Sequence, residues 1–329
     1  MTWSRNMVRT IERQTGLTLI EMMVALAIGA VLIIGAITVY TLSRQSYMMN
    51  ESNAKVQDTA TFAMDAIEAD LRMASNWGLT SRGLAINGRS TVSEANPDGI
   101  AGIPTVCGED WVLNLAIPVE GDNNSYSLPC PTAATLQPDS DHVIVRRATV
   151  DPQPLEEGRP QIQTSRNGGQ IFSDGEMPDG YADADSATHN LLVSSYYVAN
   201  DSDLIPGVPT LRRRVIRMNG GAMRIVDEEV APGVENLQIQ FGIDVDQDNS
   251  VDRYVNPGDG IYDPADPLYV PGSRVITARV WLVVRGIDRE AGLVDDRTYA
   301  PGDVNLGRFS DQYRRMQVSK TILLRNARS

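Results

Sequence analysis

One long apolar run near the start of the chain dominates its hydropathy pattern. From Met22 to Leu42 there is no charged residue across 21 positions. As a helix this run would be about 31 Å long, since each residue adds about 1.5 Å, and a bilayer core is about as thick. Arg5, Arg9 and Arg13 precede the run, and basic residues stay on the cytoplasmic side of a membrane. The pattern predicts a membrane-spanning helix with its C-terminal side facing outward.

After residue 42 the pattern becomes that of an amphipathic helix. Over about 43–75, apolar residues recur at three- and four-residue steps and share one face: Val56, Ala60, Ala63, Ile67 and Leu71. Charged residues lie off that face: Asp58, Asp65, Glu68, Asp70 and Arg72. No proline occurs before Pro97, so one helix can continue from the apolar run. We expect this half to pack on the chain's own globular region. A free coiled coil is the alternative, but the face is short and rich in alanine.

Short apolar segments, several of which alternate with polar residues, follow in the rest of the chain. They predict seven strands, at 142–150, 191–199, 210–218, 222–230, 235–244, 274–286 and 318–326. Residues 79–142 and 151–190 are rich in turn-forming residues and are expected to form long loops, in which 111–117 is the clearest strand. A long helix followed by strands joined through turns indicates an α+β fold, with an antiparallel sheet packed on the helix.

The chain is acidic, with a formal net charge of -13. This balance argues against nucleic acid as a partner, because phosphate binding needs clustered lysine and arginine. The densest basic run is Arg212, Arg213 and Arg214. We expect it to form a solvated strand face, with Arg213 pointing away from its two neighbours.

Two cysteines and two histidines limit the metal and catalytic chemistry. No CxxC or HExxH motif occurs, so a zinc site is not expected. If the C-terminal part is exported, Cys107 and Cys130 are the natural disulfide pair; two free thiols are the alternative. His142 and His189 are expected at the surface. No G-x-S-x-G or comparable motif is present, so we do not expect an enzyme.

A carboxylate interrupts the start of the apolar run. Glu21 would cost a few kcal/mol in lipid, so a plain membrane anchor does not account for it. An ordinary secretory signal has a shorter apolar core and small residues after it, and this segment has neither. Gly16 instead stands between the basic segment and the apolar run.

The sequence GLTLIE, from Gly16 to Glu21, resembles the class III prepilin signal of type IV pilins and type II secretion pseudopilins. The resemblance implies cleavage after Gly16 by a prepilin peptidase and N-methylation of the new terminus, Leu17, where the family usually has phenylalanine. It also implies that Glu21 pairs with the terminal amine of a neighbouring subunit and so helps to set the register of assembly. The implied parts are a leader at 1–16, a membrane and filament-core helix at 17–42, its amphipathic continuation at 43–78 and a β-rich periplasmic domain at 79–329.

Two further segments resemble the PilW family of minor pilins. DLRMASNWG at 70–78 is similar to the end of that family's first helix, and Gly78 is expected to be its C-terminal cap. YRRMQVSKTILLRNAR at 313–328 is similar to the family's C-terminal segment. The resemblance implies a minor pilin that takes part in the initiation or assembly of a type IV pilus, and hence in twitching motility.

The same resemblance implies partners and a location. The partners are other minor and major pilins, the inner-membrane assembly platform and the prepilin peptidase. The location is the bacterial inner membrane, crossed once with the C-terminal domain in the periplasm, and then the pilus filament or its tip. A minor pseudopilin of a type II secretion system is the main alternative; a tip adhesin and a membrane-anchored periplasmic enzyme are weaker ones.

An acidic segment at 243–255, IDVDQDNSVDRYV, has the spacing of a calcium-binding loop. Its oxygen ligands would occupy positions 1, 3, 5, 7 and 9, the seventh through a backbone carbonyl: Asp244, Asp246, Asp248, Ser250 and Asp252. Position 6 is Asn249 rather than glycine, a mild departure because asparagine tolerates the left-handed conformation. Position 12 is Val255 rather than glutamate, which removes a bidentate ligand and predicts weak binding, with a Kd on the order of 0.1–1 mM. An acidic hairpin turn is the alternative, but the repulsion between four aspartates favours Ca²⁺.

Overall fold

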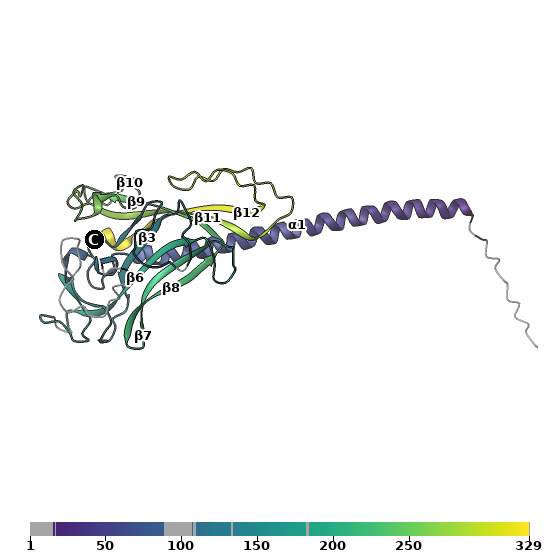
Figure 1. Ribbon diagram of the computed structural model, residues 1–329. Coiled ribbons are helices and arrows are strands. Elements are labelled where there is room, and N and C mark those ends of the chain that lie inside the picture. The colour runs from purple at the N-terminus through teal and green to yellow at the C-terminus, as the bar shows by residue number, and fades with distance from the viewer. Residues whose placement is uncertain are drawn as a thin grey trace, which may run out of the picture. The chain divides into compact units, whose positions relative to one another are not determined.

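The computed structural model describes residues 16, 18–88, 107, 110–132, 134–181 and 184–328. By its internal contacts the chain divides into two compact units, one up to Ser52 and one from Asn53 onward, which we treat separately. Figure 1 labels the main elements. The first unit contains the beginning of helix α1 (Leu19–Met73), and the second contains the rest of that helix and all the strands.

Helix α1 ends where the backbone turns left-handed. The amide of Asn76 still donates to the carbonyl of Met73 at 3.1 Å, but Ser75 has φ +64° and stops the helix. The expectation that Gly78 caps the helix is therefore wrong by several residues. Gly78 has φ +95°, and a Cβ atom there would lie 2.3 Å from the ring of His189, so this glycine allows close packing against the sheet.

The larger of the two sheets has eight strands. They are β1 (Ile86–Asn87), β2 (Val119–Asp122), β3 (His142–Ala148), β4 (Gln161–Ser165), β5 (Gly168–Phe172), β6 (Ala187–Ala199), β7 (Thr210–Asn219) and β8 (Ala222–Pro232). The order is β1-β5-β4-β6-β3-β2, and β7 joins β6 to β8. All pairs are antiparallel except β1 with β5.

The smaller sheet has four antiparallel strands in the order β10-β9-β11-β12. They are β9 (Val234–Asp244), β10 (Arg253–Val255), β11 (Arg274–Arg289) and β12 (Tyr313–Leu323). The short helices in the described part of the chain are η1 (Gly83–Ala85), α2 (Asp110–Leu113), η3 (Gly260–Tyr262) and η4 (Arg325–Arg328).

Gly233, with φ +97°, joins the two sheets between β8 and β9. A Cβ atom at Gly233 would lie 2.8 Å from the carbonyl oxygen of Arg285, so a side chain does not fit at this crossing.

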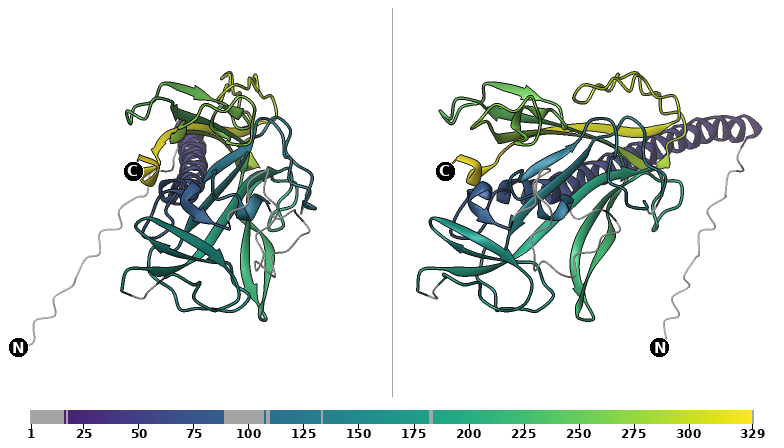
Figure 2. Two further views of the ribbon diagram at one scale, coloured as in Figure 1. Left: turned by 90° about the vertical axis from the view of Figure 1, so that its left-hand side faces the viewer. Right: turned by 60° about the vertical axis from the view of Figure 1, so that its left-hand side comes forward.

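Both sheets share one core with the C-terminal half of α1. The predicted apolar face is confirmed, because its members are at most 2% exposed: Val56, Ala60, Ala63, Ile67 and Leu71. They pack with inward-facing residues of both sheets, such as Val143, Val198 and Val280. Figure 2 shows the strands of the second unit arranged around this half of the helix. The α+β fold with a helix on an antiparallel sheet is thus confirmed.

Most predicted strands are present, and the errors have identifiable causes. Residues 111–117 form α2 and a turn instead of a strand. Their apolar side chains, such as Trp111 and Leu115, are buried in a second core, and an unbroken apolar run does not distinguish helix from strand. Strands β4 and β5 were expected to be loop because they are rich in polar residues. The Gln161 amide is fully buried and donates to the Pro154 carbonyl and to Asn190.

The structure joins Cys107 and Cys130 in a disulfide, with their Cα atoms 4.5 Å apart. Both are buried in the second core, which covers the face of the large sheet that points away from α1. The bridge therefore ties the segment before α2 to the segment that leads into β3.

Reduction of this disulfide is expected to lower the free energy of unfolding by about 3 kcal/mol, because the bridge closes a long loop in the unfolded chain. The measurement is urea unfolding of the full chain in detergent, with and without reductant. A Cys107→Ser/Cys130→Ser double variant is the control and should not respond to reductant. Equal unfolding midpoints for the oxidised and reduced wild-type chain would contradict the expectation.

Candidate functional site

The N-terminal part of α1 presents apolar side chains to its surroundings on all sides. From Leu19 to Leu42 the large apolar residues are 52–79% exposed within the chain. None of the most apolar stretch of α1 is buried, and α1 is long and apolar enough to cross a membrane. A continuous apolar surface of this size needs lipid or other helices to cover it.

Glu21 caps the start of this helix through reciprocal hydrogen bonds with Thr18. The Thr18 amide and hydroxyl both donate to Glu21 Oε2 at 2.9 Å, and the Glu21 amide donates to the Thr18 hydroxyl at 3.3 Å. This is a capping box, in which two otherwise unpaired amides at the start of a helix are satisfied. The predicted assembly residue is thus also the residue that defines where α1 begins.

Gly16 lies just before the cap and is exposed. A Cβ atom built on it would have no neighbour within 4 Å. Leu17, the predicted methylation site, lies outside the described residues. The part of the chain that the structure describes therefore leaves room for a larger residue at position 16.

Two carboxylates near the end of α1 fix the helix to the two sheets. Asp70 is 4% exposed; it accepts hydrogen bonds from Arg147 of β3 at 2.9 Å and from the Tyr196 hydroxyl of β6 at 2.7 Å. Glu68 is 8% exposed and pairs with Arg72 at 2.8 Å and with Lys320 of β12. Burial and the neighbouring Asp70 both raise the pKa of Tyr196. The sequence pattern identified these carboxylates only as lying off the apolar face, and gave no sign of this anchoring role.

The arginine run on β7 is not a solvated face, so that prediction is wrong. Arg212 and Arg214 are 2% and 1% exposed, and both contact Asp227 of β8, at 2.9 and 3.3 Å. Arg213 lies on the other face, as the alternation predicts, and pairs with Glu228. These arginines hold the β7–β8 hairpin together through cross-strand ion pairs.

The two histidines are also buried, which corrects the expectation that they lie at the surface. His142 is 1% exposed, and its two ring nitrogens lie 2.9 Å from Asp122 and 2.7 Å from the Ser195 hydroxyl. This chain of contacts has the connectivity of a serine–histidine–aspartate triad. Ser195, however, is 0% exposed in the middle of β6, so a substrate has no route to its hydroxyl in this structure. The arrangement supports a structural role.

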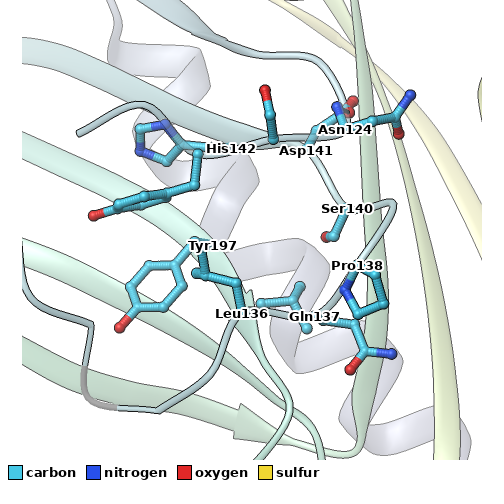
Figure 3. Close-up of a pocket in the computed structure, with 11 residues that line it drawn as sticks. Asn124, Leu136, Gln137, Pro138, Ser140, Asp141, His142 and Tyr197 are labelled. Atoms are coloured by element: carbon cyan, nitrogen blue, oxygen red, sulfur yellow. Dashed lines mark hydrogen bonds between the residues drawn. The ribbon is translucent and has the colours of Figure 1, made fainter. Parts of the chain in front are cut away.

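A small cavity of about 160 Å³ lies beside His142 (Figure 3). The segment that lines it also connects the two sheets. The Asp141 carboxylate accepts from the Asn124 amide and from the Ile239 amide of β9, both at 2.8 Å. Burial raises the pKa of Asp141 to about 7. These contacts bind the end of the β2–β3 connection to the stretch of β9 that the short strand β10 does not pair. We therefore assign the cavity to the contact between the two sheets.

The acidic loop between β9 and β10 gathers three of the predicted ligands. Asp244, Asp246 and Asp252 each offer a carboxylate oxygen within 4.8 Å of the others. Asp248 and Ser250 instead pair with each other, since the Ser250 amide donates to Asp248 at 2.7 Å. The structure therefore brings together three of the five residues that the spacing suggested.

The backbone of the loop fits a cation-binding loop, but one side-chain ion pair opposes cation binding. Asn249 has φ +69°, the left-handed conformation expected at position 6. Asp244 is fully buried but already pairs with Arg274 at 3.0 Å, so this guanidinium would compete with a cation for that carboxylate.

Comparisons with known proteins add two matches along the sequence. The family described as type IV pilus-assembly protein W, PilW, matches residues 195–326. The prokaryotic N-terminal methylation motif matches residues 12–37, which include Gly16 and Glu21. No curated protein matches the chain.

Among solved structures, a type IV-like pilin from Thermus thermophilus is similar over 64% of this chain and 84% of its own length, at 13% identity. The TM-score is 0.30, so we base no argument on this similarity.

Proposed function

We propose that this chain, which is a type IV pilin-like protein with a PilW domain and a prepilin motif, acts as a minor pilin in the assembly of a type IV pilus. The observation that carries the proposal is the combination of an exposed apolar helix with a carboxylate at its start and a PilW match in the folded unit. Its partners in the proposal are other pilins, the assembly platform and a prepilin peptidase. A pseudopilin of a type II secretion system shares the helix, but the PilW match favours the pilus.

The proposed mechanism follows from the properties of α1. Before assembly, the apolar segment keeps the chain in the inner membrane, with the folded unit in the periplasm. After the leader is removed at Gly16, the same apolar surface packs against the helices of other pilins in the filament. Glu21 then pairs with a neighbouring terminal amine, a contact that favours one alignment of the helices. The role is structural and involves no catalysis by this chain.

A Gly16→Ala variant is expected to remain as an uncut precursor, heavier than the mature chain by the leader peptide. Because a Cβ atom at position 16 would meet none of the described residues within 4 Å, we expect a block to come from the peptidase and not from misfolding. The measurement is the intact mass of the membrane-purified protein from the native host, compared with that of the wild type. Normal processing of the variant would count against a prepilin cleavage site here.

We also propose that the acidic loop binds Ca²⁺ weakly, through Asp244, Asp246 and Asp252. Three converging carboxylate oxygens suit a hard cation that prefers oxygen ligands. The ion would stabilise the β9–β10 connection by relieving the repulsion between these groups.

Millimolar Ca²⁺ is expected to raise the melting temperature of the full chain in detergent, and Asp246→Ala should abolish the rise. Asp248→Ala is the matched control: its carboxylate faces Ser250, so most of the rise should remain. The measurement is thermal unfolding with Ca²⁺ and with chelator. An unchanged wild-type melting temperature at millimolar Ca²⁺ would rule out the site.

A further inference from the structure

A groove of about 420 Å³ lies where α1 ends and the chain returns to it. It is bounded by the turn after α1, by η1, by the start of β11 and by the first residues of η4. Its volume lies in the range of pockets that hold a small molecule, which leaves room for a few side chains. It therefore suits a short segment of a partner and not the surface of a whole domain.

The charge of the groove is opposite to that of the protein. Its lining includes Arg82 and Arg274, but the described residues that line it include no aspartate or glutamate. Acidic residues outnumber basic ones in the whole chain, 42 to 29. Arg82 is exposed, and within the described part of the chain its guanidinium has no ion pair or hydrogen bond. Among the described residues, the groove is thus a local basic site in which the Arg82 guanidinium has no partner.

The rest of the lining is apolar or aromatic. Leu84, two positions after Arg82, is 51% exposed, while Val275 and Tyr262, which also line the groove, are buried. Tyr269 also lines the groove. Arginine and tyrosine are among the residues that contribute most to protein interfaces.

We propose that this groove receives a segment of a neighbouring pilin in which an apolar side chain lies next to a carboxylate. The carboxylate would pair with Arg82, since a guanidinium binds a carboxylate through two parallel hydrogen bonds. The apolar side chain would cover Leu84. This inference rests on the proposed function, because a shared membrane would hold neighbouring pilins close together and let a weak contact form.

The test places a photoreactive amino acid at Leu84 of the full chain in its native host. The expected result is a cross-link to another pilin, at a residue within about three positions of an aspartate or glutamate in that partner's sequence. Arg82→Glu should reduce the yield at least tenfold, and replacing the partner's carboxylate with lysine should restore it. Arg224→Glu is the matched control, since Arg224 is also an exposed arginine but lies on β8 outside the groove. The same probe at Leu204, which is 74% exposed, should not give this cross-link.

Three results would overturn the inference: no cross-link from Leu84, a yield that Arg82→Glu leaves unchanged, or reaction only with lipid or a second copy of this chain. The amount of mature protein in sheared filaments distinguishes a failure of this inference from a failure of the proposed function. If the processed chain is in the filaments but shows no Arg82-dependent cross-link, the groove inference alone fails. If the chain is neither processed nor in filaments, the proposed function fails.

Discussion

Glu21→Ala is expected to remove the protein from filaments while its leader is still cut. In the proposed assembly, Glu21 neutralises a terminal amine that would otherwise be an unpaired charge in an apolar environment. Breaking one partner of such a buried pair costs about 3–5 kcal/mol. Since about 1.4 kcal/mol corresponds to a factor of ten, incorporation should fall by at least about 100-fold. The measurement is the ratio of mature protein in sheared filaments to mature protein in the membrane.

The capping box provides the control for this result. Thr18→Val removes the hydroxyl contacts with Glu21 but keeps the carboxylate, so it should weaken the start of α1 by about 1 kcal/mol and still allow incorporation. Glu21→Asp keeps the charge on a shorter side chain and tests the geometry. If Thr18→Val lowers incorporation as strongly as Glu21→Ala, then Glu21 acts by starting the helix and not by pairing with a neighbour.

Asp70→Ala is expected to destabilise the folded unit by about 3 kcal/mol, because it removes the acceptor that half-buried Arg147 and buried Tyr196 share. Arg147 would lose its ion pair, and the Tyr196 hydroxyl would keep only its longer contact with the Ala66 carbonyl, at 3.2 Å. A change of this size is a large part of the stability of an ordinary domain. The measurement is urea unfolding of the full chain in detergent, followed by tryptophan fluorescence.

Asp58→Ala is the matched control, because Asp58 is an exposed aspartate on the same helix. An exposed substitution of this kind usually changes stability by less than about 0.5 kcal/mol. Asp70→Asn should give an intermediate loss, since its amide oxygen can still accept one hydrogen bond. Equal effects of Asp70→Ala and Asp58→Ala would show that the helix does not depend on this anchor.

The elements that the sequence predicts correctly are those with a regular apolar period. The face of α1 that begins at Val56 and the alternating strand that became β11 bury their apolar positions as expected. The polar strands β4 and β5 were missed because glutamine and glycine carry little apolar signal. What makes them strands is the pairing of β4 with β6 and of β5 with β4, and their own composition does not encode it.

The buried charges could not be predicted from the sequence for a related reason. An aspartate on a helix usually lies at the surface, and Asp70 is buried only because its partners come from distant parts of the chain. Arg147 is 77 residues away and Tyr196 is 126 residues away. Similarly, the spacing of the acidic loop identifies Asp244, but it cannot show which neighbouring carboxylates turn toward it.

The capping box at Thr18 also bears on the kinetics of proteolysis. The first backbone hydrogen bond of α1 runs from the Met22 amide to the Thr18 carbonyl at 3.2 Å. Hydrolysis of the peptide bond after Gly16, as proposed, would break neither this hydrogen bond nor those of the capping box. The activation barrier would therefore include no cost for unwinding the helix. A peptidase could bind the leader as an extended chain and release a product whose helix starts at the same residue as in the precursor.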